Sequence, residues 1–364
     1  MKKYILLTPG PTPLPPAVSA AMAEPILHHR TKEFGEMFDA VIKDMQYVYR
    51  TKNTVLMITT SGTGTMEAAV ANLLSPGDKT LVCVTGAFGE RFVKIQKAYG
   101  LSPVELTEEW GHAVNADKFR AALKANPGLK AIFIQHTDTS TGIVNDLKTL
   151  AAIAKEVQPE ALIVIDSVSG LAAEPLEADA WGLDVVVTGS QKGLMAAPGL
   201  GFVSLSERSW KAVDSAKLPR FYFDFRTMKK SLKDSETPYT PGVTLVAGQA
   251  KALEMIRKEG IEQVWKRTTE LALYTRAWAK KMGLSLFSKN PANILTAINL
   301  PAGVDGDALI KEILKDEGIS IAGGQLHLKG KIIRIAHMGF ITKADLDAGF
   351  AALEKRLAKT TAAR

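Results

Sequence analysis

Lys192 and Asp166 each follow an apolar run, and together they could hold a cofactor that carries an aldehyde. Asp166 ends the run at 161–166, and Lys192 follows the run at 184–189. Runs of β-branched and aliphatic residues predict buried strands, and open α/β sheets bind ligands where such strands end. A lysine there can form a Schiff base with pyridoxal 5′-phosphate, and an aspartate can hold the pyridine nitrogen protonated. A lysine after a strand is also typical of a surface turn.

A glycine-rich stretch, Ser61–Glu67, joins a predicted strand to a predicted helix and could bind a phosphate group. The backbone N–H groups of Thr63, Gly64 and Thr65 could face one anion, with the helix dipole behind them. The stretch lacks the Gly-Lys-Ser/Thr of a P-loop, and a glutamate replaces the third glycine of a dinucleotide-binding fingerprint. A capped turn without a ligand is the alternative interpretation.

Three other segments carry residue types that could contact a bound ligand. Thr85–Arg91 places Phe88 between two glycines, where its ring could stack on a flat heteroaromatic ring or simply anchor the core. Gln135–Gly142 offers hydroxyl groups, or forms an ordinary capped turn. Arg334 lies inside the apolar run Ile332–Ala336, which predicts a clamp for a substrate carboxylate or a structural ion pair.

The elements that must position these residues alternate between strand and helix through the first two thirds of the chain. Single helices between strands predict right-handed crossovers and a mostly parallel sheet covered on both faces, a three-layer α/β/α domain. The pattern predicts strands near 55–59, 80–84, 103–106, 131–135, 161–166 and 184–189, and helices near 34–49, 66–74, 90–99, 117–124 and 147–157.

Beyond Pro241 the pattern changes and predicts a smaller α+β domain. A helical region at 244–281 is broken at Glu259–Gly260, and strands near 293–300 and 332–336 alternate with helices near 307–317 and from 343 onward. We therefore expect an N-terminal arm at 1–20 that contributes to the active site, a large cofactor-binding domain at 21–255 and a small C-terminal domain at 256–364.

Composition narrows the classes of function. The 364 residues are 46% hydrophobic, and the formal charge of +7 is spread along the chain, which argues against nucleic-acid binding. A single cysteine, Cys83, and six histidines leave little material for a disulfide framework or a metal centre, so we expect no metal. No segment reaches the ~20 apolar residues of a membrane span, and the apolar stretch near the N-terminus is too short for a signal sequence. We expect a cytoplasmic protein.

Several motifs, taken in order, resemble those of the class V aminotransferases of PLP fold type I. Within that class the chain is most similar to the alanine-glyoxylate and serine-glyoxylate aminotransferases, including the serine-pyruvate type, and the resemblance spans nearly its full length. The motifs are Leu7–Thr12, His28–Arg30, Ser61–Gly64, Thr139–Gly142, Asp166–Val168, Gly189–Gly193 and Thr237–Pro241.

The resemblance implies specific roles around the cofactor ring. Lys192 would form the Schiff base and move the proton between the substrate Cα and the cofactor C4′, while Asp166 would pair with the pyridine nitrogen. Val168 would pack under the ring and Phe88 over it, where family members often have tryptophan. Thr139 would lie near the ring hydroxyl.

The resemblance also implies the ligands of the phosphate and of the substrate. Thr63, Gly64, Thr65 and Gln191 would bind the phosphate, although relatives often carry histidine where Thr65 stands. Thr240 and Thr237 would join them from the partner subunit of a homodimer. Gly10 would lie beside the substrate, and Arg334 would bind its α-carboxylate.

We therefore expect a transaminase that moves the amino group of alanine or serine to glyoxylate or another small 2-oxo acid by a ping-pong mechanism. The alternatives are a PLP-dependent lyase of the same fold and a non-catalytic partner protein like the small subunit of a soluble hydrogenase. A cysteine desulfurase is disfavoured because Cys83 lies inside an apolar run. A hydrolase built on Ser190 and Lys192 lacks a nucleophile elbow.

Overall fold

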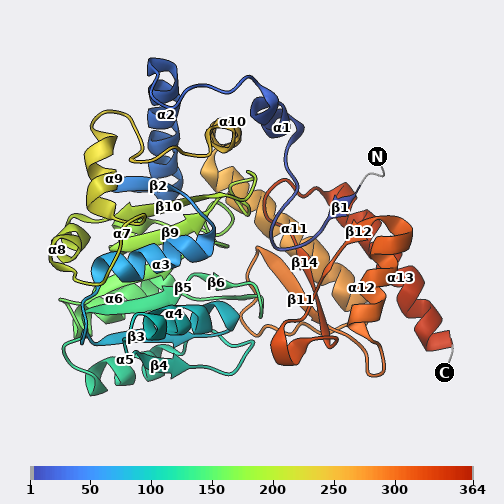
Figure 1. Ribbon diagram of the computed structural model, residues 1–364. Helices are drawn as coiled ribbons and strands as arrows, with labels where there is room; N and C mark the ends of the chain where they lie inside the picture. The colour runs from blue at the N-terminus through green and yellow to red at the C-terminus, as the bar shows by residue number, and fades with distance from the viewer. Residues whose placement is uncertain (1–3, 363–364) are drawn as a thin grey trace.

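A seven-stranded sheet forms the centre of the computed structural model, which describes residues 4–362 and the side chains of residues 4–358 (Figure 1). The strand order is β2-β10-β9-β8-β5-β3-β4, and only β10 runs antiparallel to its neighbours. This confirms the expected mostly parallel sheet. The strands are β2 (Thr54–Thr59), β3 (Thr80–Val84), β4 (Val104–Thr107), β5 (Ala131–Gln135), β8 (Leu162–Asp166), β9 (Val185–Gly189) and β10 (Leu200–Leu205).

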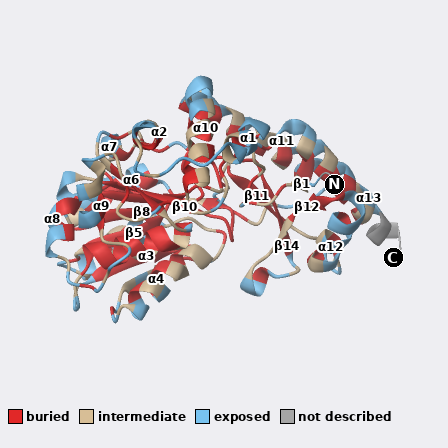
Figure 2. Ribbon diagram, turned by 45° about the horizontal axis from the view of Figure 1, so that its top comes forward, coloured by how far each residue is buried: buried red, intermediate tan, exposed pale blue. Residues whose placement is uncertain are grey.

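The strands are apolar on both faces because helices cover both sides of the sheet. In β5, Ile132 and Ile134 belong to one core with Phe38 of α2, while Phe133 belongs to the other with Phe92 of α4. Figure 2 shows buried residues running through the central strands. The first core includes α2 (Lys32–Tyr49), α5 (Ala116–Ala125), α6 (Leu147–Val157) and α10 (Val243–Glu259), and the second α3 (Gly62–Leu73), α4 (Ala87–Ala98), α8 (Glu207–Ser215) and α9 (Phe225–Leu232).

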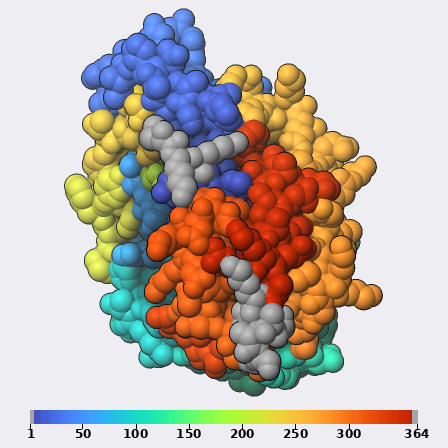
Figure 3. All heavy atoms as spheres, turned by 90° about the vertical axis from the view of Figure 1, so that its right-hand side faces the viewer, coloured from blue at the N-terminus to red at the C-terminus, as the bar shows by residue number. Residues whose placement is uncertain are grey.

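The C-terminal third forms the expected smaller α+β unit around a third core. Its antiparallel sheet has the order β11-β14-β13, and Figure 3 shows its orange and red atoms covering much of one face of the molecule. The unit contains α11 (Ile261–Lys281), β11 (Leu295–Asn299), α12 (Gly306–Glu317), β12 (Ile319–Ser320), β13 (Ala322–Gly323), a 3₁₀ turn (Leu326–Leu328), β14 (Ile332–Ala336) and α13 (Lys343–Ala362).

The N-terminal arm connects the two units. Strand β1 (Ile5–Leu6) pairs in parallel with β12 of the small unit, and α1 (Pro16–Ala23) then packs on α10 of the large unit. Of the expected domain segments, residues 1–3 of the arm and 363–364 of the small domain lie outside the described residues, and the boundaries stay predictions. No helix within residues 4–362 is both long and apolar enough to span a membrane.

Helix α4 begins at Ala87 rather than near Glu90, so Phe88 lies in its first turn. The preceding residue, Gly86, has no side chain to cap the helix. Two residues distant in the sequence supply the missing acceptors: Asp138 Oδ2 accepts the N–H of Phe88 at 3.0 Å, and Ser140 Oγ accepts the N–H of Ala87 at 3.0 Å. The local sequence therefore does not reveal where this helix starts.

Several other elements are not predicted by the spacing of apolar residues. They are α1, α7 (Ala178–Trp181), α8, α9, β10 and the β6–β7 hairpin (Thr137–Asp138, Ile143–Val144).

Candidate active site

Lys192 lies buried just beyond the carboxyl end of β9, beside the strand that carries Asp166. It is the only buried lysine among the described residues, with 7% of the residue exposed. The Nζ atom lies 3.1 Å from the Ser169 hydroxyl oxygen and 5.5 Å from the centroid of the Phe88 ring. Burial lowers the pKa of the Lys192 amine to about 8, against the opposing effect of the Asp166 charge. A large share of this amine is therefore neutral and nucleophilic near pH 8.

Asp166 ends β8 and is 4% exposed. Its Oδ1 atom accepts a hydrogen bond from the N–H of Val168 at 2.8 Å. Burial raises the pKa of the carboxyl group to about 6, although the Val168 N–H and the charge of Lys192 both favour the ionised form. At neutral pH the group is a largely ionised, poorly solvated carboxylate. Such a group gains most from a cationic N–H partner.

The first turn of α3 packs against Val168, which follows Asp166 by two residues. A Cβ atom on Gly62 would lie 2.8 Å from both methyl groups of Val168, so this position tolerates only glycine without a shift. Ser61 caps the helix by accepting the N–H of Gly64 at 3.4 Å. The N–H groups of Gly62 and Thr63 precede the first intrahelical bond and have no partner among the described residues. They provide two donors for an anion.

The side chains near this turn fit a phosphate group in part. The Oε1 atom of Gln191 is buried and has no hydrogen-bond partner among the described residues, and it would lie 2.7 Å from a Cβ atom on Gly189. The hydroxyl of Thr65 is already used, because it donates to the Gly62 carbonyl at 2.7 Å and lies 3.3 Å from the Thr188 carbonyl. The backbone donors therefore suit the phosphate of pyridoxal 5′-phosphate. Gln191 would contribute only by turning its Nε2 amide group toward the anion, since Oε1 is an acceptor. The Thr65 hydroxyl is held by the Gly62 and Thr188 carbonyls.

Arg334 joins the small unit to the same region. Its Nη1 atom donates to the Thr139 carbonyl at 2.6 Å and its Nε atom to the Gly323 carbonyl at 2.8 Å. It forms no salt bridge with the described residues, which removes the structural ion pair as an explanation. Burial lowers the pKa of the guanidinium to about 10, so it stays cationic at neutral pH. The Nη2 atom has no hydrogen-bond partner among the described residues and could bind an anionic ligand.

Gly10 brings the N-terminal arm against the lysine. Its φ of 128° favours glycine, and a Cβ atom here would lie 2.9 Å from Lys192 Cε. Two residues later the Thr12 hydroxyl donates to the Lys192 carbonyl at 3.0 Å. The arm therefore packs on both the side chain and the backbone carbonyl of Lys192.

Thr237 and Thr240 are not brought to Lys192 within this chain. The Thr237 hydroxyl donates to the Tyr239 carbonyl at 2.8 Å, and the Thr240 hydroxyl lies 3.5 Å from His29 Nε2. Both threonines line a small hollow beside β2. Their expected contact with the phosphate of a second subunit stays a prediction.

The structure adds three residues that the sequence pattern does not single out, namely Ser169, Asp138 and Arg91. Asp138 is buried and, as described above, anchors the start of α4. Its position within the polar segment Gln135–Gly142 is the only signal in the sequence. Ser169 follows Val168 directly, and Arg91 follows Phe88 by one helical turn, but their contacts depend on segments distant in the sequence.

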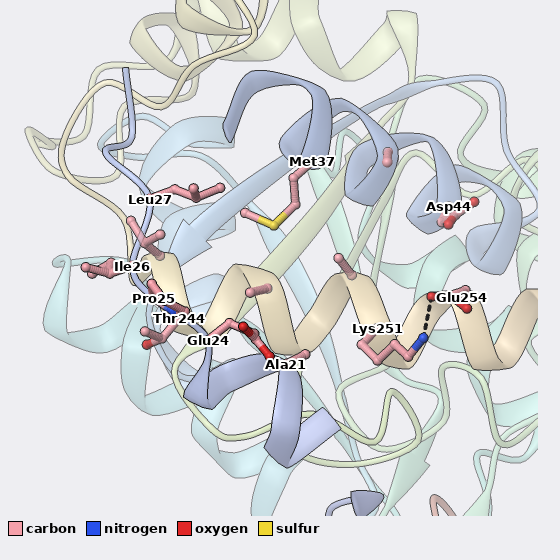
Figure 4. A pocket seen from close by; sticks show the side chains of 14 residues that line it. Ala21, Glu24, Pro25, Ile26, Leu27, Met37, Asp44, Thr244, Lys251 and Glu254 are labelled. Carbon is pink, nitrogen blue, oxygen red and sulfur yellow. Dashed lines mark hydrogen bonds and ion pairs between the residues drawn. The ribbon is translucent and has the colours of Figure 1, made fainter. Parts of the chain in front are cut away.

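A large open groove lies away from these residues. A groove of about 740 Å³ runs between the loop after α1, helix α2 and helix α10, and Figure 4 shows Ile26, Leu27 and Met37 along it. The ion pair Lys251–Glu254 lies along α10 at 2.8 Å. None of the predicted site residues lines the groove. The chemistry is assigned to the Lys192 region because buried ionisable groups converge there, whereas the groove is mostly apolar.

The lowered pKa of Lys192 predicts an unusual reactivity toward amine reagents. In the cofactor-free protein, we expect acylation of Lys192 to rise with a midpoint near pH 8, because the neutral amine is the reacting form. Peptide mass spectrometry after a short pulse of a small acylating reagent measures this. Exposed Lys43, acylated in the same sample, is the control for the reagent. A Lys192 profile that overlays that of Lys43 would contradict the prediction.

The comparisons with known proteins agree on one family. The sequence profile of the family described as Aminotransferase class-V matches residues 4–347. A protein of Anabaena cylindrica named soluble hydrogenase 42 kDa subunit is 42% identical over 97% of this chain and 92% of its own length. Serine–glyoxylate aminotransferase of Methylorubrum extorquens is 32% identical over 97% of this chain and 90% of its own.

A solved structure extends the agreement to the fold. Alanine–glyoxylate aminotransferase from Nostoc sp. superposes with a TM-score of 0.93 at 30% identity, covering 98% of this chain and 95% of that one. The similarity therefore includes the small C-terminal unit and the N-terminal arm as well as the central sheet.

Proposed function

The chain belongs to the class V aminotransferase family, and from that premise we propose that it moves the amino group of alanine or serine to glyoxylate or another small 2-oxo acid. The protein is a PLP-dependent transaminase. The observation that carries the proposal is the convergence of a buried lysine of lowered pKa, Lys192, with a buried carboxylate, Asp166, at the ends of adjacent strands.

Bound pyridoxal 5′-phosphate supplies an aldehyde that condenses with amines and a ring that accepts an electron pair from the adjacent carbon. Lys192 Nζ would hold the aldehyde carbon, and once displaced by the substrate it would take the proton from the substrate Cα. The Ser169 hydroxyl, 3.1 Å away, orients this amine. Asp166 would keep a proton on the pyridine nitrogen. Val168 and Phe88 would exclude water from the ring faces.

The substrate would be oriented by Arg334 and admitted by Gly10. The free Nη2 atom of Arg334 would bind the α-carboxylate, while its other two nitrogens are fixed to the Thr139 and Gly323 carbonyls. A guanidinium held at two points loses little further freedom on binding an anion. A glycine at position 10 keeps the space beside Lys192 Cε open.

We also propose a homodimer in which the segment Thr237–Pro241 of each subunit reaches the cofactor phosphate of the other. Phe221, 80% exposed, lies 5.9 Å from the ring of Tyr239 in that segment, and Ile26, 70% exposed, edges the apolar groove of Figure 4. Exposed apolar surface of this kind favours association. A monomeric mass in sedimentation equilibrium would refute the arrangement.

The single cysteine, Cys83, is buried and fits a reducing compartment. We therefore propose that the protein is cytoplasmic, which cell fractionation tests.

A second candidate function comes from the relative named as a soluble hydrogenase subunit. A purely structural partner would not need a buried Lys192 beside a buried Asp166, since burying both groups opposes folding. A lyase on the same fold would use both groups. The reaction products distinguish the three functions.

The test is a half-reaction screen on the cofactor-loaded protein. Alanine or serine, added without a 2-oxo acid, is expected to bleach the visible band of the cofactor and yield pyridoxamine 5′-phosphate, and glyoxylate is expected to restore the band.

The Arg334→Gln variant should need roughly 30- to 100-fold more amino acid for half-bleaching, because a charge-assisted contact with the substrate carboxylate is lost. Arg120→Gln, at an exposed ion pair with Glu156, is the matched control and should behave as wild type.

Two results would overturn the proposal. A lyase would break down the amino acid without accumulating pyridoxamine 5′-phosphate. A partner protein would leave the band unchanged with glycine and aspartate as well as with alanine and serine.

A further inference from the structure

Arg91 lies between the predicted phosphate site and the residue that would cover the ring. It follows Phe88 by one turn of α4 and is half-buried. Its Nη1 atom donates a hydrogen bond to the Thr63 hydroxyl oxygen at 2.9 Å, and its guanidinium carbon lies 4.7 Å from the centroid of the Phe88 ring. One side chain therefore links the first turn of α3 to the first turn of α4.

Arg91 has no anionic partner among the described residues. Its helix neighbour Glu90 pairs instead with Lys94, at 3.1 Å, and no salt bridge of Arg91 occurs within residues 4–358. Burial dominates the pKa of both Asp166 and Lys192, but the charge of Arg91 also acts on them: it opposes the rise in the pKa of Asp166 and adds to the fall in that of Lys192. A half-buried guanidinium without a counter-ion is a ready partner for a bound anion.

The predicted phosphate ligands lack a positive charge. Thr63, Gly64, Thr65 and Gln191 are all neutral, whereas a phosphate monoester carries about −1.5 to −2 charges at pH 7. The end of a helix supplies the equivalent of only about half a charge. Most of the phosphate charge would remain uncompensated unless a cation lies nearby.

The hydrogen bond to Thr63 also fixes the direction of that hydroxyl. Because the Thr63 oxygen accepts from Arg91, its own proton is left to donate to another acceptor. The hydroxyl lies in the same turn as the unpartnered N–H groups of Gly62 and Thr63. An anion at that turn would meet three donors with a guanidinium directly behind one of them.

We propose that Arg91 completes the cofactor's phosphate site as a positioning residue, holding the Thr63 hydroxyl as a donor and compensating the phosphate charge. The proposal rests on the proposed function, since it takes the first turn of α3 as the phosphate site. Its chemical consequence is selective. Arg91 favours the phosphorylated form of the cofactor over the same ring without phosphate.

The experiment compares two ligands that differ only in that group. Pyridoxamine 5′-phosphate and pyridoxamine are titrated into the full-length, cofactor-free chain by calorimetry, which needs no turnover. In Arg91→Gln the affinity for pyridoxamine 5′-phosphate is expected to fall roughly 30- to 100-fold, because a charge-assisted contact is lost, while that for pyridoxamine falls less than about threefold. Arg91→Lys should recover most of the loss, since it restores the charge.

Further variants separate the electrostatic role from a structural one. Phe88→Leu should weaken both ligands by a similar factor, because it removes the ring that would stack on the cofactor and leaves the charge of Arg91 in place. Thr63→Val combined with Arg91→Gln should lose less affinity than the sum of the single variants, as expected if Arg91 acts partly through Thr63. Arg120→Gln is the matched control and should leave both affinities unchanged. Circular dichroism confirms that each variant is folded.

Each possible outcome of the titrations bears on a different part of the proposal. Equal weakening of both ligands in Arg91→Gln would show that the arginine only supports Phe88 and would overturn the inference. A wild-type preference for the phosphorylated ligand that Arg91→Gln leaves intact would overturn Arg91's part alone. A wild-type protein with no preference between the two ligands would remove the phosphate site itself, and with it both the inference and the proposed function.

Discussion

Replacing Lys192 with methionine is expected to abolish transamination and to leave the purified protein colourless. Methionine has a similar length and fills the buried site, but it has no amine to hold the cofactor aldehyde or to accept the Cα proton. Both roles belong to one atom, so the loss in turnover should be at least about 10⁴-fold, as for other residues that combine covalent and proton-transfer roles.

The same replacement should not weaken the cofactor-free fold. Burial lowers the pKa of Lys192 from 10.5 to about 8, so the charged amine opposes folding at neutral pH by on the order of 3 kcal/mol. That cost is complete below about pH 8 and disappears above about pH 10.5. Lys192→Met should therefore melt at a higher temperature than the cofactor-free wild type at pH 7, and the difference should vanish near pH 10.5.

Visible absorption, turnover and thermal melting at several pH values measure these effects. Lys43→Met, at an exposed position on α2, is the matched control and should keep the colour and full activity. Turnover by Lys192→Met at the rate of the wild type would refute the assignment of this lysine. A lowered melting temperature at pH 7 would instead show that the amine is well solvated.

The central sheet and the pair at its centre are predictable because local patterns determine them. Each inner strand is an apolar run that must be buried on both faces, and such strands assemble in parallel with helices between them. Asp166 and Lys192 therefore fall at the same edge of adjacent strands β8 and β9, as expected. The sequence also identifies Gly62 as a turn residue, but it does not show that Gly62 packs closely against Val168.

The contacts that tune the site are not predictable, because they join segments far apart in the chain. Arg334 and Thr139 are 195 residues apart, and Thr12 and Lys192 are 180 apart, yet each pair is hydrogen-bonded. The sequence identifies Arg334 as an arginine in a costly apolar position. It cannot show that two carbonyls occupy two of its nitrogens and leave the third without a partner among the described residues.

Phe88 and Arg91 illustrate the same limit at a helix start. Their turn begins where Asp138 and Ser140 accept its N–H groups, 50 and 53 residues away. With only Gly86 as the N-cap, the local sequence predicts a later start, and the alignment of Phe88, Arg91 and Thr63 remains hidden. The contacts of Thr237 and Thr240 are harder still to predict, because their expected role involves a second subunit.

Replacing Asp166 with asparagine is expected to lower turnover by roughly 10³- to 10⁴-fold while the cofactor stays bound. Asparagine has the same shape and can still accept the Val168 N–H, but it cannot hold a positive charge on the pyridine nitrogen. Without that charge the ring accepts electrons poorly, and the barrier rises by about 4 to 5.5 kcal/mol, the equivalent of this loss in rate. Lys192 remains to hold the aldehyde, so the variant should be coloured.

The pH behaviour gives an independent check. Burial raises the pKa of Asp166 from 3.8 to about 6, so the charged carboxylate opposes folding of the cofactor-free protein above about pH 6. Asp166→Asn should therefore be more stable than the cofactor-free wild type at pH 7, and the difference should disappear as the pH falls through 6 toward 3.8.

The matched control is Glu174→Gln, since Glu174 is another buried carboxyl group with a pKa raised to about 7 by burial, but it contacts Asn293 rather than the lysine. Its turnover should stay within a few fold of wild type. Stopped-flow bleaching of the cofactor band with alanine or serine, together with the cofactor content of each variant, separates catalysis from binding. An Asp166→Asn protein that transaminates as fast as wild type would show that ring protonation does not depend on this carboxylate.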